Sequence, residues 1–159
     1  MTVRTFPDEI YELYQELLSG LPDGAAVLTR HPSEDPGGED IEITPANSNS
    51  ARIYVHPMGD WIYASMGQST SMEFFVSWKK ETQALESLKE VSRAVIDGKF
   101  SEDIWMLDGK IVKSAGTFVI DGKMRKMGGF RTFFNPLRRK QKQHFDYLPY
   151  SSGTLDHQD

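Results

Sequence analysis

Cysteine is missing from this sequence of 159 residues. Its absence excludes disulfide bonds, thiolate nucleophiles, zinc ribbons and iron–sulfur clusters, and it suits a reducing compartment. Long apolar runs are missing too: residues 1–9 lack the apolar core of a signal peptide, and no later stretch approaches the roughly 20 apolar residues of a membrane span. We therefore expect a cytoplasmic protein without a membrane partner.

The usual signatures of catalysis and cofactor binding are also missing. The four histidines, His31, His56, His144 and His157, are isolated in the sequence, and no two of them have the spacing of metal ligands. Acidic residues that repel phosphate flank the glycine pair at 37–38, the pair at 128–129 lacks a following Lys-Ser or Lys-Thr, and no Gly-x-Ser-x-Gly elbow occurs. We expect neither a metal nor a cofactor, and we expect a protein that is not an enzyme.

What the sequence does contain is the hydrophobic periodicity of a folded domain. Residues 7–19 and 82–97 repeat apolar side chains at the spacing of one helix face, and a glycine follows each segment. Eight short runs bounded by turn-forming residues predict strands at 25–30, 40–44, 52–56, 61–65, 72–78, 104–107, 110–113 and 117–120. Because short turns join most of these strands, we expect antiparallel pairing without parallel crossovers.

The fold class that follows is α+β: a largely antiparallel sheet of hairpins with two helices packed on one face, in the order α-β(4–5)-α-β(3). A chain of this length fits one domain and buries roughly 70% of the surface that its unfolded state exposes. We expect one domain over residues 1–150, which includes a basic C-terminal arm at about 123–150, and a disordered tail at 151–159.

Charge is divided unevenly along the chain. The formal net charge is −5, yet the segment between Gly122 and Phe145 holds eight of the 18 basic residues and no acid. The remainder is strongly acidic, with ten basic against 23 acidic residues. An acidic body with a basic arm favours partners of opposite charge, or contact between the arm and the body itself.

The basic arm interleaves its charges with aromatic residues, as surfaces that follow phosphates and stack bases do. The aromatic residues are Phe130, Phe133, Phe134, Phe145, Tyr147 and Tyr150. A nucleic-acid-binding domain would use Arg131, Arg138, Arg139, Lys140 and Lys142. The other interpretation, which we favour, is that the aromatic residues hold the arm against the acidic body.

Two further features have both a structural and a functional interpretation. The loop at 33–40 concentrates carboxylates without the alternation of a calcium-binding loop, and they belong to Glu34, Asp35, Glu39 and Asp40. This loop is either a solvated segment or a negatively charged docking surface. Across a predicted turn from Asp60 lies His56, a placement that orients an imidazole for acid–base catalysis, although turn polarity explains both residues equally well.

Aromatic residues on neighbouring predicted strands form either a core or a binding platform. These residues are Trp61, Tyr63, Phe75 and Trp78. Within the run at 72–78, one face is supplied by Met72, Phe74, Val76 and Trp78. The opposite parity therefore predicts that Phe75 is partly exposed.

Four stretches of the sequence resemble a known family. They are Trp61 to Gly67 followed by Glu73, Val95 to Glu102, Trp105 to Ser114, and the closing Phe145 to Tyr150. Across residues 52–150 their turn and hydrophobic patterns resemble small bacterial proteins associated with the immunity proteins of polymorphic toxin systems. The resemblance implies a stoichiometric inhibitor that binds a partner toxin and catalyses nothing. It implies no catalytic residues, and the basic run at 137–143 lies outside its pattern.

Our leading hypothesis is therefore a protein-binding module, an immunity protein whose acidic loop contacts a basic toxin domain. A nucleic-acid-binding domain is the alternative, and an enzyme that uses His56 and Asp60 is a third hypothesis. The first requires an accessible acidic surface, the second an accessible basic one, and the third a pocket in which both groups converge.

Overall fold

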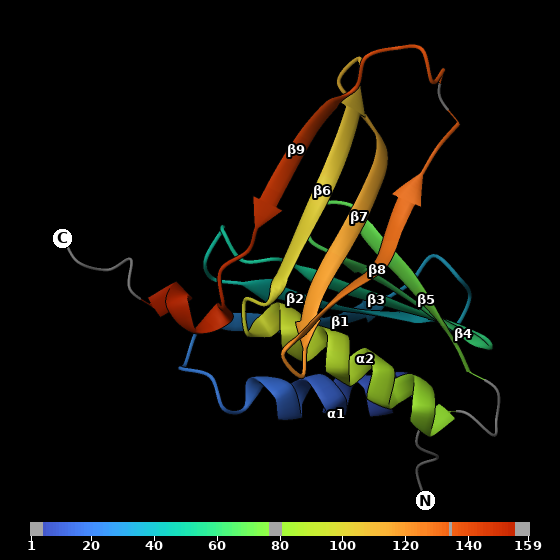
Figure 1. Cartoon of the computed structure of the whole chain (residues 1–159). Coiled ribbons are helices and arrows are strands. Elements are labelled where there is room, and N and C mark those ends of the chain that lie inside the picture. Colours follow the sequence, from blue (N-terminus) through green and yellow to red (C-terminus); the bar gives the residue numbers. More distant parts are fainter. Residues whose placement is uncertain (1–4, 77–80, 134, 155–159) are drawn as a thin grey trace, which may run out of the picture.

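The computed structural model describes residues 5–76, 81–133 and 135–154. In these residues it contains two α-helices, nine β-strands and one 3₁₀ turn (Figure 1). The first half consists of α1 (Phe6–Leu18), β1 (Ala26–Pro32), β2 (Glu39–Pro45), β3 (Ile53–Met58), β4 (Trp61–Met66) and β5 (Thr70–Phe75). The second half consists of α2 (Glu81–Ile96), β6 (Phe100–Leu107), β7 (Lys110–Ile120), β8 (Lys123–Arg131), β9 (Gln141–Asp146) and η1 (Tyr150–Thr154).

The strands form two antiparallel sheets. The first sheet is a five-stranded meander in the order β1-β2-β3-β4-β5, and the second has the order β8-β7-β6-β9. The α+β class and the antiparallel hairpins expected from the sequence are confirmed, while the division into two sheets was not predicted. In Figure 1 both helices lie below the first sheet, and the second sheet rises away from them.

Alternation along the strands gives the first sheet one buried face. This face packs against both helices and is built from the fully buried residues Ile41, Ile43, Ile53, Val55, Ile62 and Ala64. The second sheet adds its own apolar residues to the same core, namely Phe100, Phe118 and Ile120. The core therefore lies between the first sheet, the helices and the nearest part of the second sheet.

Helix α1 begins where the sequence offers helix-starting residues. Pro7 lies in the first turn, where a missing backbone N–H costs little, and the Asp8 carboxylate accepts a 2.7 Å hydrogen bond from the backbone N–H of Thr5. The apolar face that follows includes the fully buried Tyr14, whose hydroxyl lies 2.8 Å from that of Ser92 in α2. Within the described residues, neither helix has the length and apolar character needed to cross a membrane.

A buried carboxylate fastens the two sheets to each other. Glu102 of β6 is 1% exposed and accepts hydrogen bonds from the backbone N–H groups of Gln68 (2.6 Å) and Ser69 (3.3 Å). It also accepts them from the hydroxyl groups of Thr70 (2.8 Å) and Tyr147. Gln68 and Ser69 form the turn between β4 and β5, so this hairpin ends against the second sheet. We call these five residues the sheet junction.

The strands predicted at 110–113 and 117–120 are one continuous strand, β7. One residue between them, Gly116, has no room for a side chain. A Cβ atom on Gly116 would lie 2.6 Å from the Thr70 methyl carbon and 2.9 Å from the carbonyl oxygen of Met127. A glycine in a strand therefore marks a close approach here, and not an interruption.

The basic segment at 123–150 forms strands where we expected an arm. Most of it makes β8 and β9, the two edges of the second sheet, whose exposed side chains show little apolar alternation. The segment ends at Tyr150, which is fully buried and donates a 2.6 Å hydrogen bond to the carbonyl of Ala51. Of the expected C-terminal tail, residues 151–154 continue as η1, whereas residues 155–159 lie outside the described chain.

Candidate functional site

The first sheet has a second, open face whose side chains alternate with the buried ones. It carries Asp40 and Glu42 on β2, Tyr54, His56 and Met58 on β3, Trp61 and Tyr63 on β4, and Glu73 and Phe75 on β5. The strand register places His56 opposite Tyr63 and Trp61 opposite Phe75. We call this surface the open face.

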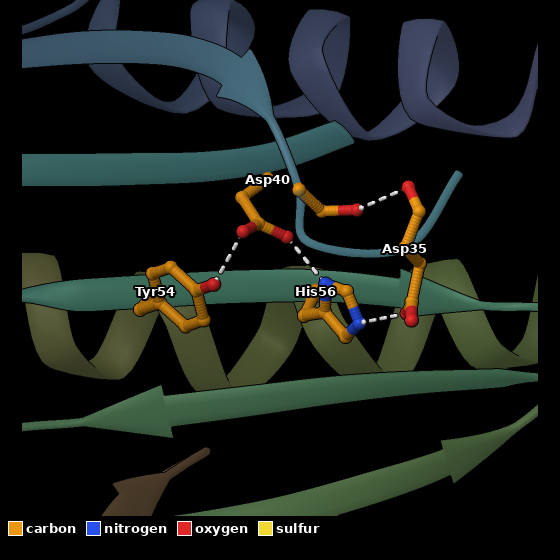
Figure 2. A network of polar contacts seen from close by, with 5 residues as sticks. Asp35, Asp40, Tyr54 and His56 are labelled. Atoms are coloured by element: carbon orange, nitrogen blue, oxygen red, sulfur yellow. Dashed lines mark hydrogen bonds and ion pairs between the residues drawn. The ribbon is translucent and has the colours of Figure 1, made fainter. Parts of the chain in front are cut away.

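An ionic network centred on His56 lies on the open face (Figure 2). The imidazole Nδ1 contacts the Asp40 carboxylate, and Nε2 lies 3.0 Å from Oδ2 of Asp35. The second oxygen of Asp40 accepts a 2.5 Å hydrogen bond from the Tyr54 hydroxyl. The side chains of His56 and Asp40 are 15% and 9% exposed, whereas that of Asp35 is 65% exposed. The network therefore couples the sheet to the loop between β1 and β2.

The carboxylates favour the charged form of the imidazole. The hydrogen bond to Asp40 raises the pKa of His56 above its ordinary value of 6.5, and the contact with Asp35 adds to this effect, while partial burial opposes it. Burial, together with the hydrogen bond to Asp40, raises the pKa of Tyr54 to about 12. The network thus combines a stabilised imidazolium with a neutral tyrosine.

A pocket of about 740 Å³ opens beside the network. Its walls include the rings of Tyr54 and Tyr63, the thioether of Met58, and the carboxylates of Glu34, Asp35 and Asp40. The volume falls in the range of known ligand pockets. Carboxylates next to aromatic rings suit a cationic group, because the cation pairs with the oxygens and packs over the rings.

Three large apolar side chains are exposed on the same face: Met58 at 45%, Trp61 at 43% and Phe75 at 51%. The rings of Trp61 and Phe75 meet edge to face, with centroids 4.9 Å apart. The predicted exposure of Phe75 is confirmed, and Trp78 lies outside the described residues. We call these three side chains the aromatic patch. Adjacent exposed apolar residues within a polar surround are typical of protein-interaction sites.

The four acids predicted to form a docking surface divide into two pairs. Glu34 and Asp35 are exposed at the pocket. Asp40 is buried inside the network, and Glu39 forms an ion pair with Arg30. Glu34 and Asp35 are therefore accessible at the pocket, although Asp35 also contacts His56, whereas Asp40 and Glu39 form contacts that stabilise the sheet.

The contact between His56 and Asp60 that an enzyme would need is not formed. Within the described residues, the imidazole contacts Asp40 and Asp35, and Asp60 is not part of the pocket wall. Asp60 lies in the turn between β3 and β4, while His56 faces Tyr63 on the adjacent strand. Because both imidazole nitrogens contact carboxylates, neither is open to take a proton from a substrate. The geometry favours a structural imidazolium over a general base.

The five basic residues predicted to bind nucleic acid lie toward the far end of the second sheet, which is the end where β8 stops and β9 starts. They are Arg131, Arg138, Arg139, Lys140 and Lys142. Arg138 forms an ion pair with Asp108 of the β6–β7 turn, at 2.7 Å. Lys142 lies 3.5 Å from Asp103, and its ammonium is 5.3 Å from the ring centroid of Trp105. A basic surface is present, and both Arg138 and Lys142 contact acids of this chain.

The aromatic residues of the same segment differ in how far they are buried. Tyr147 stacks on Phe100 with ring centroids 5.3 Å apart, and Tyr150 is fully buried, so these two do hold the segment against the body. Phe133 is fully exposed. Phe134 lies outside the described residues.

Sequence reasoning missed the role of Tyr54 and the burial of Asp40. A signal for the first was available, because Tyr54 and His56 have the opposite parity to the apolar Ile53 and Val55 and so share the other face of β3. The second depends on the pairing of β2 with β3. This pairing brings Asp40 to His56 from 16 positions away.

Among the described residues, no group of histidine and carboxylate side chains has an arrangement that could hold a metal ion. The network contains one histidine and two aspartates, but both ring nitrogens are already taken up by the carboxylates. Comparisons of the chain with models of protein families, with curated proteins and with solved structures found no match.

Proposed function

We propose that this chain is a non-catalytic protein-binding module that uses the open face of its first sheet to hold a basic protein partner. In line with the resemblance to immunity proteins, we propose that the partner is a toxin domain, neutralised by stoichiometric binding in the cytoplasm. The observation that carries this proposal is the presence, on one open face, of the aromatic patch beside an acidic, tyrosine-lined pocket.

The aromatic patch supplies the apolar centre that a protein interface needs. Tryptophan is enriched among the residues whose loss costs most in binding, and aromatic residues are enriched at interfaces generally. The rings of Trp61 and Phe75 already hold each other in edge-to-face contact. Little side-chain freedom is therefore lost when a partner covers them.

The pocket supplies charge complementarity. Its exposed acids, Glu34 and Asp35, stand beside the rings of Tyr54 and Tyr63. A lysine or arginine side chain fits this arrangement, because its charge pairs with the carboxylates while its stem or guanidinium plane packs on the rings. The net charge of −5 steers a basic partner toward the chain and raises the association rate.

The test is titration calorimetry of the purified chain against the product of the adjacent gene. The double variant Trp61→Ala/Phe75→Ala removes the centre of the patch, and we expect binding about 30-fold weaker or worse. The double variant Glu34→Lys/Glu73→Lys reverses two exposed charges, one at the pocket and one on the open face. It should slow association and reduce the dependence of binding on salt.

The controls change other exposed residues of the same kinds, away from the open face. Met124→Ala removes a side chain that is 73% exposed on β8, and Glu86→Lys/Asp97→Lys reverses two exposed charges on or just after α2. These variants should bind as the wild type does. Absence of binding at micromolar concentration, or an equal loss in the controls, would contradict the proposal.

A further inference from the structure

The end of the second sheet that lies farthest from the helices exposes apolar side chains to an unusual extent. Phe133 and Leu137 are 103% and 92% exposed in the connection between β8 and β9, and Phe130 at the end of β8 is 40% exposed. In Figure 1 this connection reaches the upper limit of the molecule, remote from both helices. We call these three side chains the apolar tip. Phe133 and Leu137 bury almost nothing, so packing within the chain does not explain them.

Positive charge surrounds the apolar tip. Residues 130–140 and the adjacent turn at 107–110 contain one acid, Asp108, and the basic residues Lys110, Arg131, Arg138, Arg139 and Lys140. The turn and the connection are joined by the ion pair of Arg138 with Asp108, at 2.7 Å. Where the connection begins, the backbone N–H of Thr132 donates a 2.8 Å hydrogen bond to the carbonyl of Val112. An acidic protein thus presents a locally basic end.

We propose that this end of the second sheet docks onto the surface of an anionic lipid bilayer. Phe133 and Leu137 enter the boundary between headgroups and acyl chains, where apolar side chains gain from leaving water. The basic residues lie against anionic headgroups, and each lysine or arginine near such a surface adds to the attraction. Docking of this kind needs no membrane-spanning helix. The proposal therefore replaces our expectation of no membrane partner, which rested on the missing apolar runs alone.

Nucleic acid is the other occupant that a basic, aromatic surface suggests. Stacking of bases needs flat rings, and one of the two most exposed side chains of the tip is the aliphatic Leu137. The ammonium groups of Lys113 and Lys142 lie 4.4 and 5.3 Å from the ring centroid of the nearby Trp105. A base that stacked on this ring would have to compete with these two cations. A lipid surface uses aromatic and aliphatic side chains alike, so the observations favour it.

The test is sedimentation of the full chain with vesicles of phosphatidylcholine mixed with phosphatidylglycerol, and with vesicles of phosphatidylcholine alone. We expect binding to the mixed vesicles that weakens as salt rises, and little binding to the neutral ones. Phe133→Ser/Leu137→Ser should weaken binding about tenfold or more. Arg138→Gln/Arg139→Gln should weaken it roughly 20-fold at low salt. Circular dichroism checks that these variants of an exposed connection fold as the wild type does.

Controls use the opposite end of β8. Met124→Ser removes another apolar side chain, which is 73% exposed, and Lys123→Gln/Lys126→Gln removes two exposed charges. Both should sediment as the wild type does, as should Trp61→Ala/Phe75→Ala, which tests the open face separately. Absence of sedimentation with mixed vesicles at low salt overturns the proposal. So does sedimentation that survives Phe133→Ser/Leu137→Ser, or capture of a single-stranded oligonucleotide through Arg138 and Arg139 without vesicle binding.

Discussion

The two sheets are built from the same kind of antiparallel hairpin, yet they meet the solvent differently. In the first sheet, one face is buried against the helices and the other carries acids and aromatic rings. The second sheet contributes Phe100, Phe118 and Ile120 to the core, while its far end is exposed and basic. The two surfaces therefore differ in charge: acids lie at the pocket of the open face, and basic residues gather at the far end of the second sheet.

Each sheet also holds a histidine between two aspartates. In the first sheet this is His56, and in the second it is His144, which lies 2.7 Å from Asp103 and 3.1 Å from Asp146. The contacts are alike, but the side chain of His56 is 15% exposed and that of His144 is 52% exposed. Solvent screens exposed ion pairs far more than partly buried ones. We therefore expect the first cluster to stabilise the fold more than the second.

The largest expected effect comes from Glu102, which joins the two sheets. Glu102→Ala leaves two backbone N–H groups and the hydroxyls of Thr70 and Tyr147 without their acceptor. We expect the free energy of unfolding to fall by about 3 kcal/mol, or the melting temperature by roughly 10 °C. Urea denaturation measures the loss. Glu102→Gln should be intermediate, because its amide keeps one acceptor oxygen but turns a donor toward the other donors.

The control for the sheet junction is Glu73→Ala, which removes an exposed glutamate from β5. Its unfolding free energy should change by less than about 0.5 kcal/mol. If both variants lost the same stability, the buried Glu102 would contribute no more than an exposed acid does. Apolar contacts alone would then hold the two sheets together.

Apolar periodicity is sufficient to predict the elements that bury a face. Leu88, Val91 and Val95 are all fully buried in the core, so the buried face of α2 is visible in the sequence as an apolar stripe. This stripe is what predicts the helix. It does not predict β8 or β9, since edge strands with exposed side chains need no apolar alternation. A basic edge strand and a basic arm have the same composition, and only the hydrogen bonds of the sheet distinguish them.

The candidate site could be predicted in part. The parity of β3 and β5 places Tyr54, His56 and Phe75 on faces opposite to the buried residues, and the sequence shows this parity. The partner of His56 could not be predicted, because residues 46–52 connect β2 and β3 and no tight turn fixes their register. Proximity along the chain favours Asp60, whereas the register selects Asp40.

Removal of the histidine from the first cluster is the next largest effect. His56→Ala removes the imidazolium from the carboxylate of Asp40, which is 9% exposed and still accepts a hydrogen bond from Tyr54. We expect a loss of about 2 kcal/mol in urea denaturation. Adding Asp40→Asn to this variant should restore part of the loss, because a neutral amide costs less to bury than a charge. No recovery in the double variant would contradict an electrostatic role for His56.

The pH dependence of stability should also separate the clusters, by a smaller amount. Because pairing raises the pKa of His56 above 6.5, the folded chain binds this proton more tightly than the unfolded chain does. The stabilisation is fully present below about pH 6.5 and is lost as the pH rises through the raised pKa. We expect the unfolding free energy to fall more between low and high pH in His144→Ala, which retains His56, than in His56→Ala. Urea denaturation at stepped pH measures this difference. Equal losses would place both clusters in the same dielectric surroundings.

The smallest effect belongs to the second cluster. His144→Ala should lower the unfolding free energy by less than about 0.5 kcal/mol, because Asp146 is 83% exposed and water replaces the lost contacts. Lys142, at 3.5 Å from Asp103, also leaves a cation beside that carboxylate. Urea denaturation at low and high salt measures the difference, which should shrink further as salt screens the remaining charges. A loss as large as that of His56→Ala would show that contact geometry, and not exposure, sets the strength of these clusters.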